Sequence, residues 1–251
     1  GKHHGKSCMN RWCPFFDMTA EPLDHPHVRY VNSIDELVST PMRDGVNALC
    51  LRRTLEGDFE EVIRHLHVER GITTLERDQL LALPVSAAGK IAIETMLRDQ
   101  EELRAYGFDP EIDCVNGYIG HDQQELMRTD VCSFHVDRAT DIADTYLCTY
   151  VGASSIGVCH EDVILRAQEP AVRARLLADF GGADDESFLE YLTENYYDLH
   201  YDALPNARTF SFGVGHLWRI AIDYPGTDVP PCIHRAPDPI DGEPPRLILI
   251  G

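Results

Sequence analysis

The sequence predicts an α+β protein, with helices in its first half and strands in its second. Apolar residues recur at helical spacing over residues 58–67 and 86–106. From residue 113 onward, short apolar or alternating runs are separated by proline- and glycine-rich turns, a pattern typical of a sandwich or barrel. Two helical patterns interrupt these runs, so we expect a helical insertion over residues 170–202.

The first half is expected to begin with a short strand over residues 28–31. Ser33 followed by Glu36 is a capping-box signature, which predicts a helix that starts here. Residues 46–51 form an apolar run that predicts a buried strand, and the two longer helices follow it. These helices are expected to buttress the strands of the second half.

The second half is expected to form most of the core. Its predicted strands cover residues 131–136, 145–151, 156–159, 209–214, 217–222 and 246–250. The insertion contains two predicted helices, over residues 171–180 and 184–199, and we expect them to form a lid.

The chain is expected to form one domain over residues 28–251, because it shows no repeat and no low-complexity linker. Within it we distinguish an N-terminal α/β part, residues 28–112, from a β core, residues 113–251. The sequence starts without Met, and residues 1–27 are expected to be a leader, in part added for expression. The leader carries metal-binding residue types without the paired spacing of zinc fingers, namely His3, His4, Cys8 and Cys13.

Composition narrows the classes of partner. The 42 acidic residues against 22 Lys and Arg give a formal charge of −20, which would repel a nucleic-acid backbone. No apolar run approaches the roughly 20 residues that span a bilayer, and no signal peptide is evident, so we expect a cytoplasmic protein. The eight scattered cysteines favour reduced thiols over a disulfide framework. The sequence does not indicate an oligomeric state.

A candidate metal site begins with His135 and Asp137, which are separated by one position in a predicted strand. Side chains alternate between the two faces of a strand, so these two should share a face, while Phe134 and Val136 point the other way. One imidazole and one carboxylate are two of the three ligands of a facial iron triad, which lacks only a second histidine. The alternative is a hydrogen-bonded pair inside a barrel.

His234, in a proline-rich segment after a turn, is the predicted second histidine. His216, which follows Gly213 and Gly215 in the sequence, is the alternative second histidine. Arg246 opens the last predicted strand. The His-x-Asp pair, a distant His and a following Arg together resemble the iron(II)- and 2-oxoglutarate-dependent oxygenases over residues 131–250. The segments around His135 and His234 are also similar to a bacterial family of unknown function.

The oxygenase resemblance implies a double-stranded β-helix, also called a jelly-roll or cupin-like fold, for the core. It implies that His135, Asp137 and His234 hold Fe(II) as the catalytic centre and that Arg246 binds the distal carboxylate of the co-substrate 2-oxoglutarate. The resulting dioxygenase would use dioxygen to hydroxylate, desaturate or cyclise a small polar metabolite such as an amino acid.

Two other functions would use the same residues. A cupin-like iron oxygenase would bind its substrate directly at the metal, and Arg246 would anchor the carboxylate of that substrate. A non-catalytic homeostasis protein would hold zinc or iron at the triad. Three further histidines, His121, His160 and His200, lie in acidic, turn-like or helical contexts and are expected to be solvated.

Overall fold

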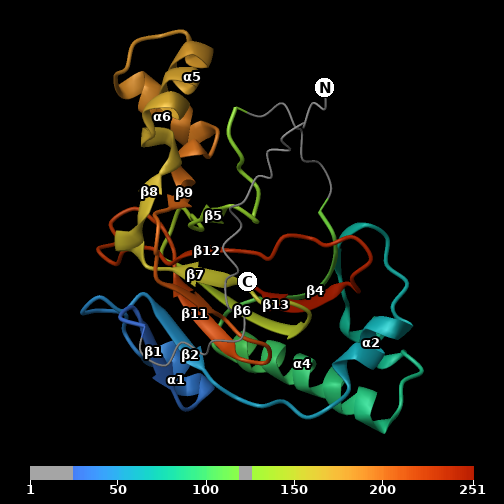
Figure 1. The fold of residues 1–251 in the computed structure, drawn as a ribbon. Coiled ribbons are helices and arrows are strands. Elements are labelled where there is room, and N and C mark those ends of the chain that lie inside the picture. The colour runs from blue at the N-terminus through green and yellow to red at the C-terminus, as the bar shows by residue number, and fades with distance from the viewer. Residues whose placement is uncertain (1–24, 119–125) are drawn as a thin grey trace, which may run out of the picture.

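The computed structural model describes residues 25–118 and 126–251, and it has two mostly antiparallel β-sheets and six α-helices in this part of the chain (Figure 1). This arrangement confirms the predicted α+β class. The predicted leader lies outside the described residues except for 25–27, and so does His121. None of the described helices is long and apolar enough to cross a membrane.

One sheet has seven strands and the other has six. The first sheet contains, in spatial order, β1 (Val28–Val31), β2 (Ala48–Leu51), β11 (Leu217–Ala221), β6 (Asp144–Val151), β13 (Arg246–Ile250), β4 (Glu111–Asn116) and β3 (Gly71–Thr74). The second contains β10 (Thr209–Ser211), β7 (Ile156–Val158), β12 (Ile233–Arg235), β5 (Phe134–His135), β9 (His200–Ala203) and β8 (Val163–Leu165). The seven-stranded sheet therefore takes strands from both the α/β part and the β core distinguished in the sequence.

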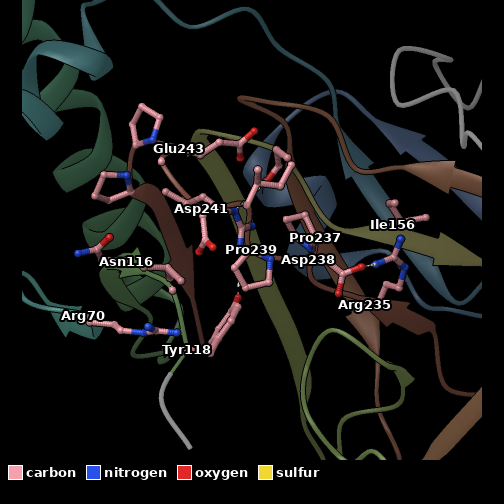
Figure 2. Close-up of a pocket in the computed structure, with 18 residues that line it drawn as sticks. Arg70, Asn116, Tyr118, Ile156, Arg235, Pro237, Asp238, Pro239, Asp241 and Glu243 are labelled. Carbon is pink, nitrogen blue, oxygen red and sulfur yellow. Dashed lines mark hydrogen bonds and ion pairs between the residues drawn. The ribbon is translucent and has the colours of Figure 1, made fainter. Parts of the chain in front are cut away.

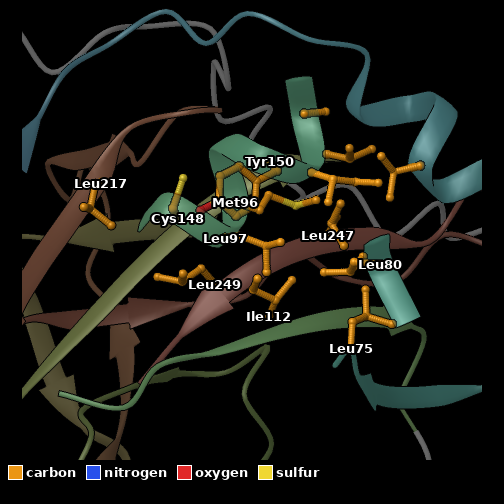
Figure 3. Packing of buried hydrophobic residues seen from close by; sticks show 14 of the residues in the cluster. Leu75, Leu80, Met96, Leu97, Ile112, Cys148, Tyr150, Leu217, Leu247 and Leu249 are labelled. Atoms are coloured by element: carbon orange, nitrogen blue, oxygen red, sulfur yellow. The ribbon is translucent and has the colours of Figure 1, made fainter. Parts of the chain in front are cut away.

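The N-terminal helices cover the outer face of the seven-stranded sheet. They are α1 (Ile34–Ser39), α2 (Phe59–His65), α3 (Arg77–Leu81) and α4 (Ala87–Ala105). The predicted cap is present, since Ser33 Oγ accepts a hydrogen bond from the Glu36 amide at 3.1 Å. The apolar stripe of α4 is buried against the sheet, and Figure 3 shows Met96 and Leu97 close to Ile112 of β4. These helices buttress the sheet as predicted.

A buried ion pair lies within this helix–sheet core. Arg53 donates to both carboxylate oxygens of Asp99 on α4, at 2.7 and 2.5 Å, and Tyr150 of β6 donates to the same carboxylate at 2.6 Å. The Asp99 side chain is 5% exposed. A buried charge is tolerated only when it is paired and hydrogen-bonded, and this network meets that condition.

The inner face of the seven-stranded sheet packs on the six-stranded sheet. Trp218 of β11 stacks on Phe212 at 4.4 Å between ring centroids, and its indole donates to the Phe212 carbonyl at 2.8 Å. Phe210 of β10 continues the stack at 5.6 Å from Trp218. The two sheets thus form a sandwich whose interior is apolar at one end.

The predicted helical insertion is present and forms α5 (Pro170–Phe180) and α6 (Glu186–Glu194), followed by a 3₁₀ turn at Tyr197–Leu199. It has a small core of its own around Leu176 and Phe188. Both helices stand away from α1, α2 and α4 in Figure 1. Residues 200–202 were expected to belong to the insertion, but they lie in β9, which pairs with β8 and β5.

Several strands differ from the prediction. The expected strand 131–136 is reduced to β5, because the Asp130 side chain and carbonyl accept hydrogen bonds from the amides of Cys132 and Ser133 and hold a turn there. Five strands were not predicted at all, namely β3, β4, β8, β9 and β12. The six cysteines in the described residues are buried free thiols, as predicted.

Candidate metal centre

Strand pairing brings two of the predicted ligands together. β5 and β12 are antiparallel neighbours, and His135 lies directly opposite His234. Residues in this relation project from the same face of a sheet, and the two ring centroids are 4.6 Å apart. Their neighbours Phe134 and Ile233 are buried in an apolar cluster on the other face. The alternation predicted from the sequence is therefore present.

Asp137 completes the group two residues beyond His135. Its Oδ1 lies 3.5 Å from His135 Nε2 and 3.8 Å from His234 Nε2. The three ligand atoms all lie within 4.8 Å of one another, as required around a single ion. Asp137 follows β5 rather than belonging to it, and its carbonyl accepts from the Asp223 amide at 2.8 Å.

Backbone carbonyls fix the tautomers of both imidazoles. His135 Nδ1 lies 2.8 Å from the Ser133 carbonyl, and His234 Nδ1 lies 3.1 Å from the Cys232 carbonyl. A carbonyl oxygen only accepts, so each Nδ1 carries the hydrogen and each neutral ring presents its Nε2 lone pair to Asp137. Histidines that ligate metals are oriented by this kind of outer hydrogen bond.

The opposite sheet orients the carboxylate. Thr145 of β6 donates from its hydroxyl to Asp137 Oδ2 at 2.7 Å, which leaves Oδ1 facing the two rings. Burial alone would raise the pKa of Asp137, but the neighbouring His234 and His135, when they are protonated, and the hydrogen bond from Thr145 hold that pKa well below its usual range. Burial alone would lower the pKa of His135, and the Asp137 contact outweighs it and raises that pKa. Asp137 is therefore ionised at neutral pH.

His216, the rival ligand, is not part of this group. Its Nδ1 accepts a hydrogen bond from the Arg53 amide at 3.1 Å. Within the described residues, the structure therefore groups His234 and not His216 with the first pair.

His200 was expected to be solvated, and that expectation is wrong. It lies on β9 directly opposite His135 and is 4% exposed. Burial and the neighbouring His135 lower its pKa to about 4. Its Nδ1 has no hydrogen-bond partner among residues 25–118 and 126–251. The sequence context predicted an exposed His200 because the strand that buries it, β9, was not predicted.

Arg246 opens onto the same cavity as the triad. The cavity between the sheets has a volume of about 170 Å³ and is lined by His135, Asp137, His234 and Arg246. Arg246 donates to the Ala153 carbonyl at 2.8 Å and to the Tyr118 hydroxyl at 3.3 Å.

These two partners of Arg246 are neutral, and it forms no ion pair with any carboxylate in the described residues. Burial lowers the pKa of its guanidinium. A buried cation without a counter-ion is costly, so this position is suited to binding an anion.

A second, more open pocket adjoins the inner cavity and shares Tyr118 and Arg246 with it. Its volume is about 550 Å³. Figure 2 shows that side chains of both charge signs surround it. The charged residues in its wall, besides Arg246, are Arg70, Arg235, Asp238, Asp241 and Glu243.

Two residues of the site were not predicted from the sequence, Thr145 and Tyr118. Thr145 opens a strand that was predicted, but its contact with Asp137 joins the two sheets, and no local pattern indicates such a contact. Tyr118 follows β4, which was not predicted. Arg246, the partner of Tyr118, is distant in the sequence, whereas Asp137 is close to Thr145 in the sequence but belongs to the other side of the sandwich.

Comparison of the chain with models of protein families, with curated proteins and with solved structures finds no match. The chemistry of the site therefore rests on its geometry. Two neutral imidazoles and one carboxylate can hold a divalent transition metal, and the guanidinium across the cavity can hold a carboxylate ligand.

Proposed function

We propose that the protein is an iron(II)- and 2-oxoglutarate-dependent oxygenase built on a double-stranded β-helix. The observation that carries the proposal is the position of Arg246, a buried guanidinium without a carboxylate partner in the described residues, in the cavity that the candidate triad also lines. A metal site alone would not require such a cation. A co-substrate with a free carboxylate would.

The donor set supports iron as the metal. His135, His234 and Asp137 supply two imidazoles and one carboxylate, the combination found in facial-triad iron oxygenases, which leaves further coordination positions open. Bound iron would supply the redox chemistry that activates dioxygen. Thr145, Ser133 and Cys232 would hold the three ligands in orientation through the hydrogen bonds described above.

Arg246 would bind the distal carboxylate of 2-oxoglutarate. A guanidinium presents a planar fork of donors that matches a carboxylate in bidentate fashion. The Tyr118 hydroxyl, which already contacts Arg246, and the side chains of Thr149 and Ser155 also line the cavity and can add hydrogen bonds. The oxo-acid end would then face the triad.

The outer pocket would receive the substrate. It contains arginines and carboxylates around one opening, which suits a zwitterion such as an amino acid better than an anion or an apolar molecule. The packing of the two sheets would exclude water from the inner cavity. The inferred reaction is oxidation of a small polar metabolite by hydroxylation, desaturation or cyclisation.

The test is iron content after anaerobic purification, followed by oxygen uptake with and without 2-oxoglutarate. We expect about one iron per chain. His135→Ala and His234→Ala should each remove it, and the matched variant His216→Ala should retain it. Iron retained in both ligand variants would exclude the site, and oxygen uptake that is independent of 2-oxoglutarate would exclude the co-substrate.

A further inference from the structure

A second group of metal-ligand side chains lies where the chain enters β1. His27 directly precedes β1, and His160 and Glu161 form a 3₁₀ turn, His160–Asp162, that follows β7. His27 Nε2 is 2.7 Å from Glu161 Oε2, and His160 Nε2 is 3.2 Å from Glu161 Oε1. The ligand atoms of all three residues lie within 4.8 Å of one another.

Hydrogen bonding sets the tautomer of His27. Its Nδ1 lies 2.6 Å from the Gly45 carbonyl, which only accepts, so Nδ1 carries the hydrogen. In the neutral ring, Nε2 then presents a lone pair to Glu161 Oε2, which is also an acceptor. Two lone pairs at 2.7 Å repel each other unless a cation lies between them, either a proton on the ring or a metal ion. The guanidinium of Arg208 does not fill this role, because its Nη2 is 3.9 Å from Glu161 Oε2.

His160 favours the metal ion. A proton shared by His27 and Glu161 needs no third group, yet His160 directs Nε2 at the other oxygen of the same carboxylate. Its Nδ1 is buried and has no hydrogen-bond partner in the described part of the chain. Nε2 is therefore the nitrogen of this ring that is available to an ion beside Glu161, and the hydrogen of the neutral ring then lies on Nδ1.

We propose that His27, His160 and Glu161 form a second metal site, for zinc or a similar divalent ion. Two imidazoles and one carboxylate suit zinc, which takes nitrogen and oxygen ligands in sites of low coordination number. The bound ion would join the segment before β1, at the edge of the seven-stranded sheet, to the turn after β7 of the six-stranded sheet. It would therefore clamp the two sheets together at this edge.

Cys159 is a positioning residue of this site. Its buried Sγ donates to Glu161 Oε2 at 2.6 Å. A carboxylate oxygen only accepts, so the thiol is the donor in this contact and orients the Glu161 carboxylate. Cys159→Ala should weaken zinc binding roughly 10-fold to 100-fold, as the loss of an orienting contact typically does, and Cys159→Ser should restore part of the affinity.

The experiment uses the full chain with His135→Ala and His234→Ala, stripped of metal by a chelator, so that the first site does not contribute. Zinc is added, excess is removed by dialysis, and bound zinc is counted by mass spectrometry. Adding His160→Ala with Glu161→Gln should remove one equivalent. Zinc bound elsewhere, including at the leader residues outside the described part, would remain in both proteins and cancel in the difference.

Two controls separate loss of the site from loss of the fold. His65→Ala removes a histidine 4.0 Å from a carboxylate, Glu61, that belongs to no described group of three ligands, and zinc content should not change. Zinc should raise the melting temperature of the parent but not of the His160→Ala, Glu161→Gln protein. In the chain with an intact first site, the same pair should lower total zinc by one equivalent.

Equal zinc content, or an equal shift in melting temperature, with and without the His160→Ala and Glu161→Gln pair would overturn the second site. Because the parent lacks His135 and His234, that result would leave the proposed oxygenase centre untouched. Conversely, loss of one zinc equivalent would support the second site whatever the oxygen-uptake assay shows.

Discussion

Replacing Arg246 should weaken 2-oxoglutarate binding without affecting iron. Within the described residues, the guanidinium donates to a carbonyl, at 2.8 Å, and to the Tyr118 hydroxyl, at 3.3 Å, and pairs with no carboxylate, so its charge is available for a ligand carboxylate. A charge-assisted hydrogen bond contributes about 1.5–3 kcal/mol. Since each 1.4 kcal/mol changes an equilibrium constant tenfold, Arg246→Ala should raise the dissociation constant of 2-oxoglutarate roughly 10-fold to 100-fold.

The same change should not destabilise the protein. Arg246 is buried without an ion pair to any described carboxylate, and an apolar side chain of similar length avoids the cost of desolvating a charge. Arg246→Met should therefore have a free energy of unfolding equal to or above that of the wild type. Arg246→Lys should recover only part of the affinity, because an ammonium keeps the charge but lacks the planar fork.

The assay is a titration of 2-oxoglutarate into the anaerobic iron(II) protein, followed by the charge-transfer absorption expected from the resemblance to the oxygenases. Arg235→Ala is the matched control, since Arg235 lines the outer pocket but not the inner cavity. If the wild type develops no such absorption, 2-oxoglutarate is not the co-substrate. If Arg246→Ala binds as tightly as the wild type, the co-substrate is right and the anchor is wrong.

Three further predictions concern other residues. Thr145→Val should lower iron affinity about 10-fold to 100-fold in a chelator competition, because the valine cannot donate the hydrogen bond that orients Asp137. Thr145→Ser should restore the affinity, and an unchanged affinity in Thr145→Val would exclude an orienting role for Thr145. Asp99→Ala should cost about 3–5 kcal/mol in urea unfolding, because it leaves Arg53 buried and unpaired; a loss below about 1 kcal/mol would contradict a buried pair. The pKa of His135 is raised in the folded protein, so protonation of His135 stabilises the metal-free fold. This stabilisation is fully present below a pH of about 6.5, the pKa of histidine in the unfolded chain, and it is lost as the pH rises through the higher pKa of the folded protein. Iron affinity should move the other way and rise with pH, because the ion competes with the proton on His135, and chelator competition at pH 6 and 8 checks the sign.

The sequence was sufficient to propose His135 and Asp137 as ligands because their relative orientation depends only on the local backbone. Alternation along an extended segment places His135 and Asp137 on one face, even though the strand itself is only two residues long. The choice between His234 and His216 was not local. It depends on the pairing of β12 with β5, and β12 is a three-residue strand within a proline-rich segment, too short for its own alternation to be recognised.

The second group of ligands shows the same limit more clearly. His160 and Glu161 are adjacent in the sequence, but a histidine followed by an acid is a common pair and predicts nothing about metal binding. Their partner, His27, lies 134 positions from Glu161 and was assigned to the leader. Only the packing of the segment before β1 on the turn after β7 brings the three side chains together.

The position of the main site between the sheets explains why its ligands can be held accurately with few direct contacts. β5 and β12 fix the spacing of the two imidazoles through backbone pairing in one sheet, while Thr145 of the other sheet holds the carboxylate. The geometry of the triad thus depends on the distance between the sheets, which the stacked Phe212 and Trp218 maintain at the apolar end of the sandwich. The polar end can then carry a buried cation and a cavity, since the stability that they cost is supplied by the apolar packing elsewhere in the same sandwich.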